Sequence, residues 1–340
     1  MLVLDGREAL PAPFRAQGSV ATVGVFDGVH LGHFHVLREV VRRAEARGAM
    51  PVMVTFGGHP KGLLLGKAPA TITSLEHRLL LFQRAGIGAT LVLQFSPELR
   101  ELSAEAFTTD ILLEGLGLQE LVFGFDSKFG KDRGGNPTSL APLSARLGFA
   151  IDEVPALRLD GRAVSSTVIR EAVALGDLDR AGRMLGRPVS VLGKVVRGDG
   201  RGRQLGFPTA NLDLLHELHP PAGVYAAMAC RPDAPATEGQ LHPAVVNIGR
   251  RPTFKDGEDP ESVEVHILDF DGDLYGDTIE VFFLARLRGE ERFADGAALQ
   301  AQVEADIDAA RGFTAAADEV WRVPGRFLPI EGSRPEDLLA

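Results

Sequence analysis

Hydrophobic and polar positions are arranged in one way up to about Leu185 and in another way beyond it. In the first part, short apolar runs rich in β-branched residues alternate with segments whose apolar residues recur at helical spacing. The expected strands are 20–26, 52–56, 89–95, 121–125 and 151–154, and the expected helices are 36–44, 75–85, one opening at 103, one near 143 and 167–185. Repeated strand–helix units predict a parallel, doubly wound Rossmann-like sheet covered by helices, an α/β domain.

Beyond Pro188 the apolar residues alternate with period two. The expected strands are 189–196, 223–229, 244–248, 263–268 and 279–284, with Gly, Pro and Asp clusters between them. This spacing predicts an antiparallel β-barrel, with a helix over 297–309 packed against it. The helix stop at residues 186–188 marks the boundary, so we expect domains over 1–186 and 187–330, followed by an irregular tail, 331–340.

Composition narrows the class of protein. The 340 residues are 45% hydrophobic and 24% charged, which is typical of soluble globular domains. The formal net charge of −10 disfavours nucleic acid and anionic membranes as partners. No apolar run approaches the ~20 residues that span a bilayer, the start lacks signal-peptide features, and Cys230 is the single cysteine. We therefore expect a cytoplasmic protein with a buried thiol and no disulfide; the oligomeric state stays open.

The first candidate site lies where the first expected strand meets the first helix. Residues 24–33 read GVFDGVHLGH, at the edge where open α/β sheets bind ligands. Gly28 and Gly32 allow close approach of the backbone to a phosphate, beside the positive end of a helix. His30 and His33 are three residues apart, so both rings can face one phosphoryl group. The alternative is a pair of structural histidines in a turn.

The H-x-G-H element resembles the nucleotidyltransferase superfamily, and with FDGV before it looks like the FMN adenylyltransferase half of bacterial FAD synthetases. Two departures from that pattern are Gly57-Gly58 before His59-Pro60 and Ser127 after Asp126. The resemblance implies that His30 and His33 are catalytic and that Asp126 orients the flavin or its phosphate. The nucleotide-binding residues that it implies in this segment are Gly24, Phe26, Asp27, Gly28 and Gly32.

The segment 164–170, VSSTVIR, supports the same resemblance. By physics alone it is a helix start, with a hydroxyl capping free N–H groups and Arg170 on a solvated face. The functional interpretation has it bind the triphosphate and follow the pyrophosphate as it leaves. The residues assigned to that role are Ser165, Ser166, Thr167 and Arg170.

The second candidate site is the glycine-rich segment 198–211. Its composition also fits a mobile hairpin turn, and it contains neither a Walker P-loop nor G-x-G-x-x-G. However, Thr209 and Asn211 are two apart, so an extended backbone presents both oxygens to one side. Hard oxygen ligands that leave room for substrate phosphates suit Mg²⁺.

This segment resembles riboflavin kinase, and the resemblance continues through 221–225, 247–254 and 264–268. It implies that Thr209 and Asn211 serve the metal and the nucleotide and that Glu264 is the base. Glu264 and His266 share one face of the expected strand, opposite Val263 and Val265, although a solvated glutamate would alternate in the same way. The ATP contacts assigned here also include Gly198 and Gly202, and the flavin contacts include Arg288 and Phe293.

An acidic stretch after the expected strand 263–268 has the ligand spacing of a calcium-binding loop. Oxygen-bearing residues occupy positions 1, 3, 5, 7, 9 and 12 of an EF-hand-like pattern that starts at Asp269 and ends at Glu280. Leu274 stands where the sharp turn needs glycine, and strands flank the stretch. We expect an acidic hairpin connection.

Together these motifs predict a bifunctional transferase of flavin cofactor synthesis. Riboflavin and ATP would give FMN in the barrel, and FMN with a second ATP would give FAD and pyrophosphate in the α/β domain, with Mg²⁺ as cofactor. One alternative is a cytidylyltransferase acting on a polyol phosphate, which leaves the riboflavin-kinase half unexplained. The other is a non-catalytic binding protein for flavin or an oligonucleotide.

Overall fold

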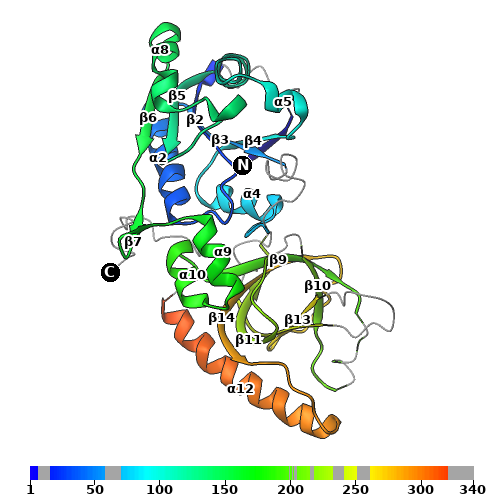
Figure 1. The fold of residues 1–340 in the computed structure, drawn as a ribbon. Helices are drawn as coiled ribbons and strands as arrows, with labels where there is room; N and C mark the ends of the chain where they lie inside the picture. Colours follow the sequence, from blue (N-terminus) through cyan, green and yellow to red (C-terminus); the bar gives the residue numbers. More distant parts are fainter. Residues whose placement is uncertain are drawn as a thin grey trace. The chain divides into compact units, whose positions relative to one another are not determined.

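The computed structural model of the chain forms two compact units (Figure 1). The first comprises Met1–Ala70 and Leu75–Ser166, and the second comprises Thr71–Ser74 and Thr167–Ala340. The residues described by the structure are 1–6, 16–57, 70–198, 200, 202, 205–214, 218–232, 241–250 and 261–320. Whether the segments on either side of the predicted boundary at residue 186 fold independently stays a prediction.

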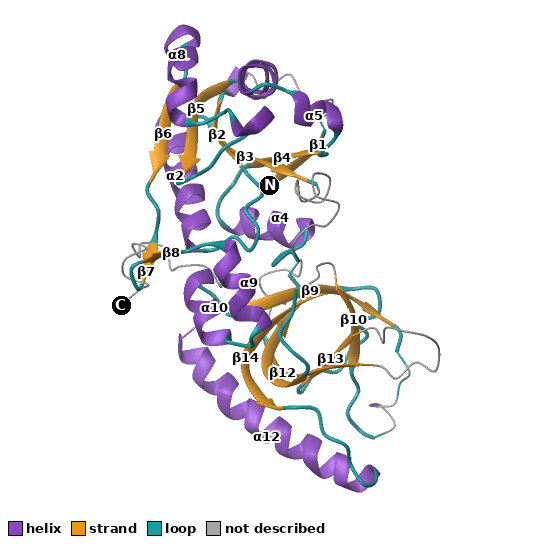
Figure 2. Ribbon diagram, in the orientation of Figure 1, coloured by secondary structure: helices purple, strands orange, loops and turns teal. Residues whose placement is uncertain are grey.

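The first unit is built on a six-stranded sheet of order β1-β4-β3-β2-β5-β6, in which all neighbouring strands are parallel (Figure 2). The strands are β1 (Leu2–Asp5), β2 (Ser19–Val23), β3 (Met50–Phe56), β4 (Ala89–Leu93), β5 (Leu118–Gly124) and β6 (Ala150–Val154). A two-stranded ribbon, β7 (Arg158–Leu159) and β8 (Arg162–Ala163), follows. The sheet confirms the predicted Rossmann-like α/β fold.

Helical segments accompany this sheet. They are α2 (Leu31–Arg47), α4 (Leu75–Arg84), α5 (Pro97–Glu101), α6 (Ala104–Ala106), the π-helical turn η2 (Phe107–Leu113), α7 (Glu114–Leu116), the 3₁₀ turn η3 (Lys131–Arg133) and α8 (Pro137–Leu147). Helix α2 packs on β2, β3 and β5, and it ends at Gly48, whose φ of 62° is the left-handed conformation of a helix stop.

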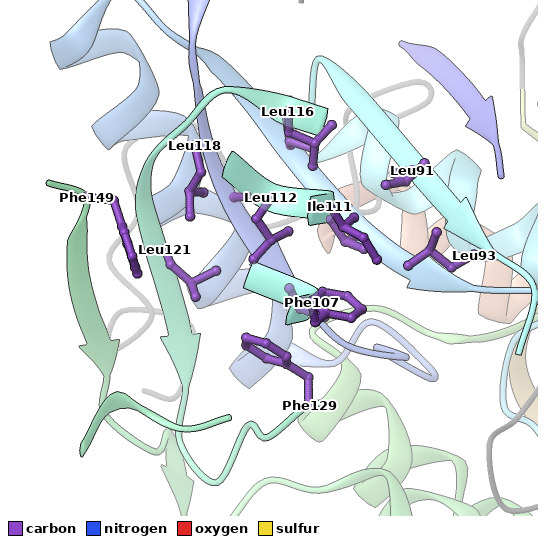
Figure 3. Close-up of a cluster of buried hydrophobic side chains, with 14 of the residues drawn as sticks. Leu91, Leu93, Phe107, Ile111, Leu112, Leu116, Leu118, Leu121, Phe129 and Phe149 are labelled. Atoms are coloured by element: carbon purple, nitrogen blue, oxygen red, sulfur yellow. The ribbon is translucent and has the colours of Figure 1, made fainter. Parts of the chain in front are cut away.

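A hydrophobic core holds η2 against the sheet. Phe107, Ile111 and Leu112 project from η2 onto apolar strand residues, and Phe129 lies beside Phe107 with ring centroids 4.9 Å apart (Figure 3). Side chains of a strand alternate between the two faces of the sheet. This core therefore contains every second strand residue, and α2 covers the residues of the other face. This shared core holds the strands, and with them the loops at their carboxyl ends, in place.

The order of the sheet locates a ligand site. From β2 the chain proceeds outward through β3 and β4, and then β5 and β6 are added on the opposite side of β2. The direction of winding therefore reverses between β2 and β5. In open α/β sheets, ligands bind at the carboxyl ends of the strands at such a switch point, and here residues 24–30 and 125–127 follow those two strand ends.

The second unit is a closed antiparallel barrel of order β10-β13-β12-β11-β14-β9. Its strands are β9 (Val189–Val196), β10 (Ala210–Leu214), β11 (Gly223–Cys230), β12 (His242–Arg250), β13 (Glu261–Ile267) and β14 (Thr278–Arg288). Its helices are α9 (Ser166–Ala174), which spans the division, α10 (Leu178–Leu185) and α12 (Gly296–Val320). The predicted barrel and C-terminal helix are confirmed.

Helix α12 lies along the outside of the barrel and contacts β11, β12 and β14 (Figure 1). Ala310 and Ile307 on the helix join Val224 and Ala226 of β11 in one apolar cluster. The single thiol, Cys230, is buried at the end of β11, as expected. The outer face of the barrel therefore also carries packed side chains, where β11 and α12 meet.

Two predictions of local structure were wrong. The expected helix 167–185 is two helices, because Gly176 adopts a φ of 74° and the side chain of Asp177 accepts a hydrogen bond from the Arg180 N–H (3.1 Å) to start α10. The acidic stretch after β13 is not a hairpin connection, since β13 and β14 are not neighbours in the barrel.

Other differences are small. The pattern missed β1 and β10, and α12 extends beyond the expected 309. Strand β1 has four residues of which only Leu4 is buried, so it carries almost no periodic signal. The predicted irregular tail 331–340 and the motif residues 58–60 lie outside the described residues.

Candidate functional site: two sites, one in each unit

In the first unit, a strained turn connects β2 to α2. Phe26 (φ 52°) and Val29 (φ 38°) both occupy the left-handed region, which costs about 1 kcal/mol or more for residues with a Cβ. The N–H of Val29 donates to the carbonyl of Phe26 (3.1 Å), and Gly28 completes the turn with a φ of 80°. Such strain persists only when the surroundings fix it, and it is typical of functional turns.

Both predicted histidines lie at the end of this turn, and the structure brings them together. His30 is the N-cap of α2: its Nδ1 accepts the His33 N–H at 3.3 Å, so in the neutral ring the proton is on Nε2, a hydrogen-bond donor. The two rings stack with centroids 3.6 Å apart, and the Phe26 ring stacks on His33 at 4.5 Å. The pair therefore forms one rigid unit at the helix N-terminus.

The predicted glycines make room for these rings. A Cβ at Gly24 would lie 2.7 Å from the Phe26 ring, and one at Gly32 would lie 3.2 Å from the His30 ring. Gly28 has the conformational role just given. The structure thus supplies a packing reason for Gly24 and Gly32, whereas the sequence argument gave Gly32 a role in phosphate approach.

The predicted triphosphate-binding segment is divided between the units. Ser165 and Ser166 belong to the first unit, where the Ser166 hydroxyl donates to the carbonyl of Asp27 (3.0 Å) and so joins this segment to the turn. Thr167 and Arg170 are on α9 in the second unit. Their approach to the histidine pair stays a prediction.

Asp126 follows β5 at the adjacent strand end. Its carboxylate lies 3.0 Å from Lys128 Nζ, whose hydrogen bond lowers the pKa of Asp126, so this group stays ionised at neutral pH. Phe125 beside it is 59% exposed, which is unusual for a large aromatic side chain at the edge of a buried strand. Ser127 closes a tight turn by donating its N–H to the carbonyl of Gly124 (2.9 Å).

In the second unit, three of the predicted kinase residues, Asn211, Glu264 and Arg288, lie in one row across the barrel. Asn211 of β10 is opposite Glu264 of β13, and Glu264 is opposite Asn247 of β12. The row continues through Val224 of β11 to Arg288 of β14. Register partners point to the same face, and neighbouring strands are about 4.8 Å apart. Residues distant in the sequence therefore form one continuous strip on the outside of the barrel.

At one end of this strip the oxygen ligands converge. The Thr209 hydroxyl lies 3.5 Å from Glu264 Oε2, and Asn211 is nearly buried beside the same residue. Two glycines allow this packing. A Cβ at Gly198 would lie 2.2 Å from Asn211 Nδ2, and one at Gly202 would lie 2.4 Å from the Phe207 carbonyl and 3.2 Å from Thr209 Oγ1. All five predicted residues are thus neighbours.

Four residues of the strip, Glu264, Asn247, Val224 and Arg288, line a cavity of about 410 Å³. Glu264 and His266 line it from β13, whereas Val263 and Val265 are buried on the opposite face, which is the predicted alternation. Its walls combine apolar and polar side chains, as ligand pockets do. The further lining residues include Gly202, Phe207, Thr209, Val245, Phe293, Leu299, Gln300, Val303 and Asp306.

Arg288 and Phe293 are at the other end of the strip. The guanidinium of Arg288 binds Asp306 of α12 with distances of 2.8–3.1 Å, and it lies 5.5 Å from the Phe293 ring centroid. Both charged side chains are mostly buried. Arg288 therefore fixes α12 to the barrel while its stem and the Phe293 ring face the cavity.

Three residues that sequence reasoning did not assign contribute to the site in the second unit. Asn247 faces the cavity beside Glu264, and the motif N-I-G-R-R-P-T-F was the available signal. His266 Nδ1 lies 2.7 Å from the carbonyl of Pro208 and so holds the segment that carries Thr209. Asp306 had no signal, because an acidic residue on an exposed-looking helix has no distinctive pattern.

The acidic stretch after β13 has structural partners. Asp269 binds Arg311 of α12 through two hydrogen bonds of 2.8 and 2.9 Å, and Glu280 is buried in β14, where the Ser190 hydroxyl donates to it (3.3 Å). Over the described ranges, no three His, Cys, Asp or Glu side chains are grouped so that they could hold a metal ion.

A doubly wound sheet with a histidine pair at its switch point, followed by a barrel with a Thr–Asn–Glu cluster at the edge of a cavity, defines a two-domain phosphoryl- and nucleotidyl-transferring enzyme. Comparison with known families agrees. The family model described as FAD synthetase matches residues 13–168, and the one described as riboflavin kinase matches residues 185–314. The chain belongs to the family of bifunctional riboflavin kinase/FMN adenylyltransferases, which are transferases.

Individual relatives extend over most of the chain. The bifunctional riboflavin kinase/FMN adenylyltransferase of Pseudomonas fluorescens is 40% identical over 299 residues, which cover 88% of this chain and 94% of that protein. The protein of the same name from Haemophilus influenzae is 35% identical over 298 residues, which cover 87% of this chain and 94% of the relative.

A solved structure has the same fold. It is titled "Crystal Structure of Macrolide-efflux Protein from Streptococcus pneumoniae", it is 30% identical, and it aligns with a TM-score of 0.75 over 92% of this chain and 99% of its own. Within the described part of this chain, none of the helices combines the length and the apolar character that a membrane crossing requires.

Proposed function

We propose that the second unit transfers the γ-phosphate of ATP to riboflavin and that the first unit adenylylates the FMN so formed. The observation that supports the proposal is the row of register partners in the barrel: Asn211, Glu264 and Arg288 lie on one strip, and Glu264 and Arg288 line the same cavity as Thr209. Measured along the curved outside of the barrel, the strip from Asn211 to Arg288 crosses four strand spacings, about 19 Å, with a proposed ligand of the ATP phosphates at one end and a proposed flavin contact at the other.

In the kinase step, Glu264 acts as the base. Its carboxylate faces the cavity between Thr209 and Asn247, where it accepts the proton of the ribityl hydroxyl as that oxygen attacks the γ-phosphorus of ATP. The oxygen–phosphorus bond to ADP breaks at the same time. The apolar residues Val224, Val245 and Leu299 bury the flavin ring, and Phe293 with the stem of Arg288 closes that end.

The oxygen atoms of Thr209 and Asn211 fit Mg²⁺. Both are hard neutral ligands. The glycine-rich segment packs directly on them, because a Cβ at Gly198 would clash with Asn211 and one at Gly202 would crowd Thr209. A bound Mg²⁺ would neutralise charge on the ATP phosphates. The close packing of Gly198 and Gly202 then keeps the two side chains oriented before substrate arrives.

In the adenylyl transfer, an FMN phosphate oxygen attacks the α-phosphorus of ATP and pyrophosphate leaves. His30 and His33 donate hydrogen bonds to the oxygens on which charge grows, and their stacking on Phe26 keeps them in place. Asp126 orients the flavin or its phosphate. Ser165, Ser166, Thr167 and Arg170 hold the departing pyrophosphate. The backbone of Gly24, Asp27 and Gly28 borders the nucleotide at the switch point.

The test is to incubate the purified chain with riboflavin, ATP and Mg²⁺ and to separate the flavins by chromatography. FMN followed by FAD is the expected result. No flavin product would favour the cytidylyltransferase interpretation, and bound but unconverted riboflavin would favour a binding protein. Because ATP is the co-substrate and the one thiol is buried in reduced form, we also propose the cytoplasm as its compartment.

A further inference from the structure

Arg78 is a buried arginine in the first unit that neither motif contains. It lies on α4, only 4% exposed. Its Nη1 donates to the carbonyl of Val25 (2.7 Å) and to the Thr55 hydroxyl (3.0 Å), and its Nη2 donates to the carbonyl of Phe56 (3.2 Å). Val25 follows β2, whereas Thr55 and Phe56 end β3. One guanidinium thus joins the carboxyl ends of two neighbouring strands.

The carbonyl that Arg78 holds is the entry to the strained turn. Val25 precedes Phe26, whose φ is 52°, and the Thr55 hydroxyl donates to the same carbonyl at 3.4 Å. Two left-handed residues with side chains in one short turn are unfavourable, and external contacts must offset that strain. A cationic donor supplies a stronger contact than a neutral one.

Helix α4 supports the turn at a second point. Phe82, one helical turn after Arg78, is fully buried and meets the Phe26 ring edge-on with centroids 6.3 Å apart. Phe26 in turn stacks on His33, and His33 stacks on His30. The same face of α4 therefore fixes the backbone of the turn through Arg78 and the ring stack through Phe82.

We propose that Arg78 is a positioning residue for nucleotidyl transfer: by holding the Val25 carbonyl against the end of β3, it aims the stacked His30–His33 pair at the reacting phosphate. The proposal rests on the function proposed for the first unit. Arg78 does not contact substrate, because its side chain is buried and its two terminal nitrogens donate to protein oxygens.

Positioning differs from two other roles in what it predicts. A phosphate ligand would change the KM for ATP when it is removed. A residue that only stabilises the fold would lower activity no more than any other variant of equal stability. A positioning residue instead lowers kcat at saturating ATP, because a misplaced donor loses interactions made in the transition state, and a displacement of ~1 Å costs about a hundredfold.

The experiment compares Arg78→Met with a matched control, Arg43→Met. Arg43 binds Glu120 and Asp152, both at 2.5 Å, so its loss also breaks partly buried charge pairs of the first unit. It is on α2, thirteen residues beyond His30, about 20 Å along the helix. Three readouts are taken: FMN to FAD kinetics, the melting temperature, and hydrogen–deuterium exchange of the peptide 24–34.

For Arg78→Met we expect kcat of FAD formation to fall by about a hundredfold with the KM for ATP changed less than about threefold. Arg78→Lys should recover part of this loss, since an ammonium can reach the Val25 carbonyl but cannot span both strand ends. Exchange of the Val29 N–H should rise in Arg78→Met. Riboflavin to FMN should be unchanged, and Arg43→Met should keep its kcat and its exchange in 24–34.

The proposal is overturned if Arg78→Met keeps near-normal turnover, if Arg43→Met loses as much kcat at an equal loss of melting temperature, or if exchange in 24–34 is unchanged. Because exchange needs no turnover, it decides whether Arg78 holds the turn even in a chain that made no FAD. A wild-type chain that makes no FAD would refute the proposed function of the first unit. The exchange data would then decide on their own whether Arg78 holds the turn.

Discussion

Replacement of Gly198 by alanine tests the ligand end of the barrel strip with a single methyl group. A Cβ at this position would lie 2.2 Å from Asn211 Nδ2 and 2.5 Å from its Cγ. Ordinary contact begins at 3.4 Å, so the Asn211 amide must move by about 1.2 Å. Gly198 does not adopt a left-handed φ, so alanine is compatible with the backbone there, and the three atoms nearest to the added Cβ all belong to Asn211.

The size of the effect follows from that displacement. A misplacement of ~1 Å of a group that orients substrate costs about a hundredfold in rate. We therefore expect Gly198→Ala to lower kcat for riboflavin to FMN by about that factor and to raise the Mg²⁺ concentration needed for half-maximal rate. The assay is chromatographic separation of FMN from riboflavin at saturating ATP, over a series of Mg²⁺ concentrations.

Two controls accompany it. The same chain converting supplied FMN to FAD reports on the first unit, which should be unaffected. Gly312→Ala is the matched glycine variant: its Cβ would meet nothing within 4 Å, and alanine in a helix interior is favoured by about 1 kcal/mol. Kinase turnover within about threefold of wild type in folded Gly198→Ala would refute the placement of Asn211 as a ligand.

Further predictions concern both sites and the fold. Glu264→Gln should abolish riboflavin to FMN and leave FMN to FAD nearly intact in the same flavin assay, because the amide cannot accept a proton; retained kinase turnover would remove Glu264 as the base. His30→Ala and His33→Ala should each slow FAD formation by roughly a hundredfold in kcat, and only His30→Ala should also lose the helix cap, about 1 kcal/mol in denaturant unfolding; unchanged turnover in both would make the histidines structural. Phe125→Ala should raise the KM for FMN without lowering kcat, since the exposed ring beside Asp126 is placed to stack on the flavin; an exposed-phenylalanine control is Phe313→Ala on α12, and equal effects in the two would exclude stacking. Hydrogen bonds from Arg42 and Arg43 lower the pKa of Glu39 to about 2 from 4.5, so the stability that ionised Glu39 contributes is present above pH 4.5 and lost as the pH falls toward 2; the difference in melting temperature between wild type and Glu39→Gln should shrink over that range, and a constant difference would contradict the ion pair.

Periodicity in the sequence was sufficient for the fold and for the placement of single residues on faces. The alternation of Val263, Glu264 and Val265 predicted which side chains leave the barrel interior, because strand geometry has a fixed period of two. The spacing of His30 and His33 likewise predicted that both rings lie on the same side of the helix start, and there they stack. These are local relations, set by a few bonds of backbone.

Relations across the sheet and the barrel were beyond the sequence. Asn247 and Arg288 reach the Glu264 row only through the register of β12, β11 and β14, which depends on barrel closure. Arg78 reads as an ordinary charged residue of an amphipathic helix, and only the fold shows that its guanidinium is buried at the ends of β2 and β3. The break at Gly176 was hidden because the apolar spacing continues through it.

The central claim is that two separate sites in this chain act in sequence on one flavin. Its most direct test is complementation between Glu264→Gln, which lacks the kinase base, and His33→Ala, which lacks a transferase donor. Each variant is incubated with riboflavin, ATP and Mg²⁺ alone and then in an equimolar mixture, and FAD is quantified. The account predicts little or no FAD from either variant alone and FAD at close to the wild-type rate per active site from the mixture, because FMN released by one chain is adenylylated by the other. FAD from Glu264→Gln alone, or none from the mixture, would contradict it.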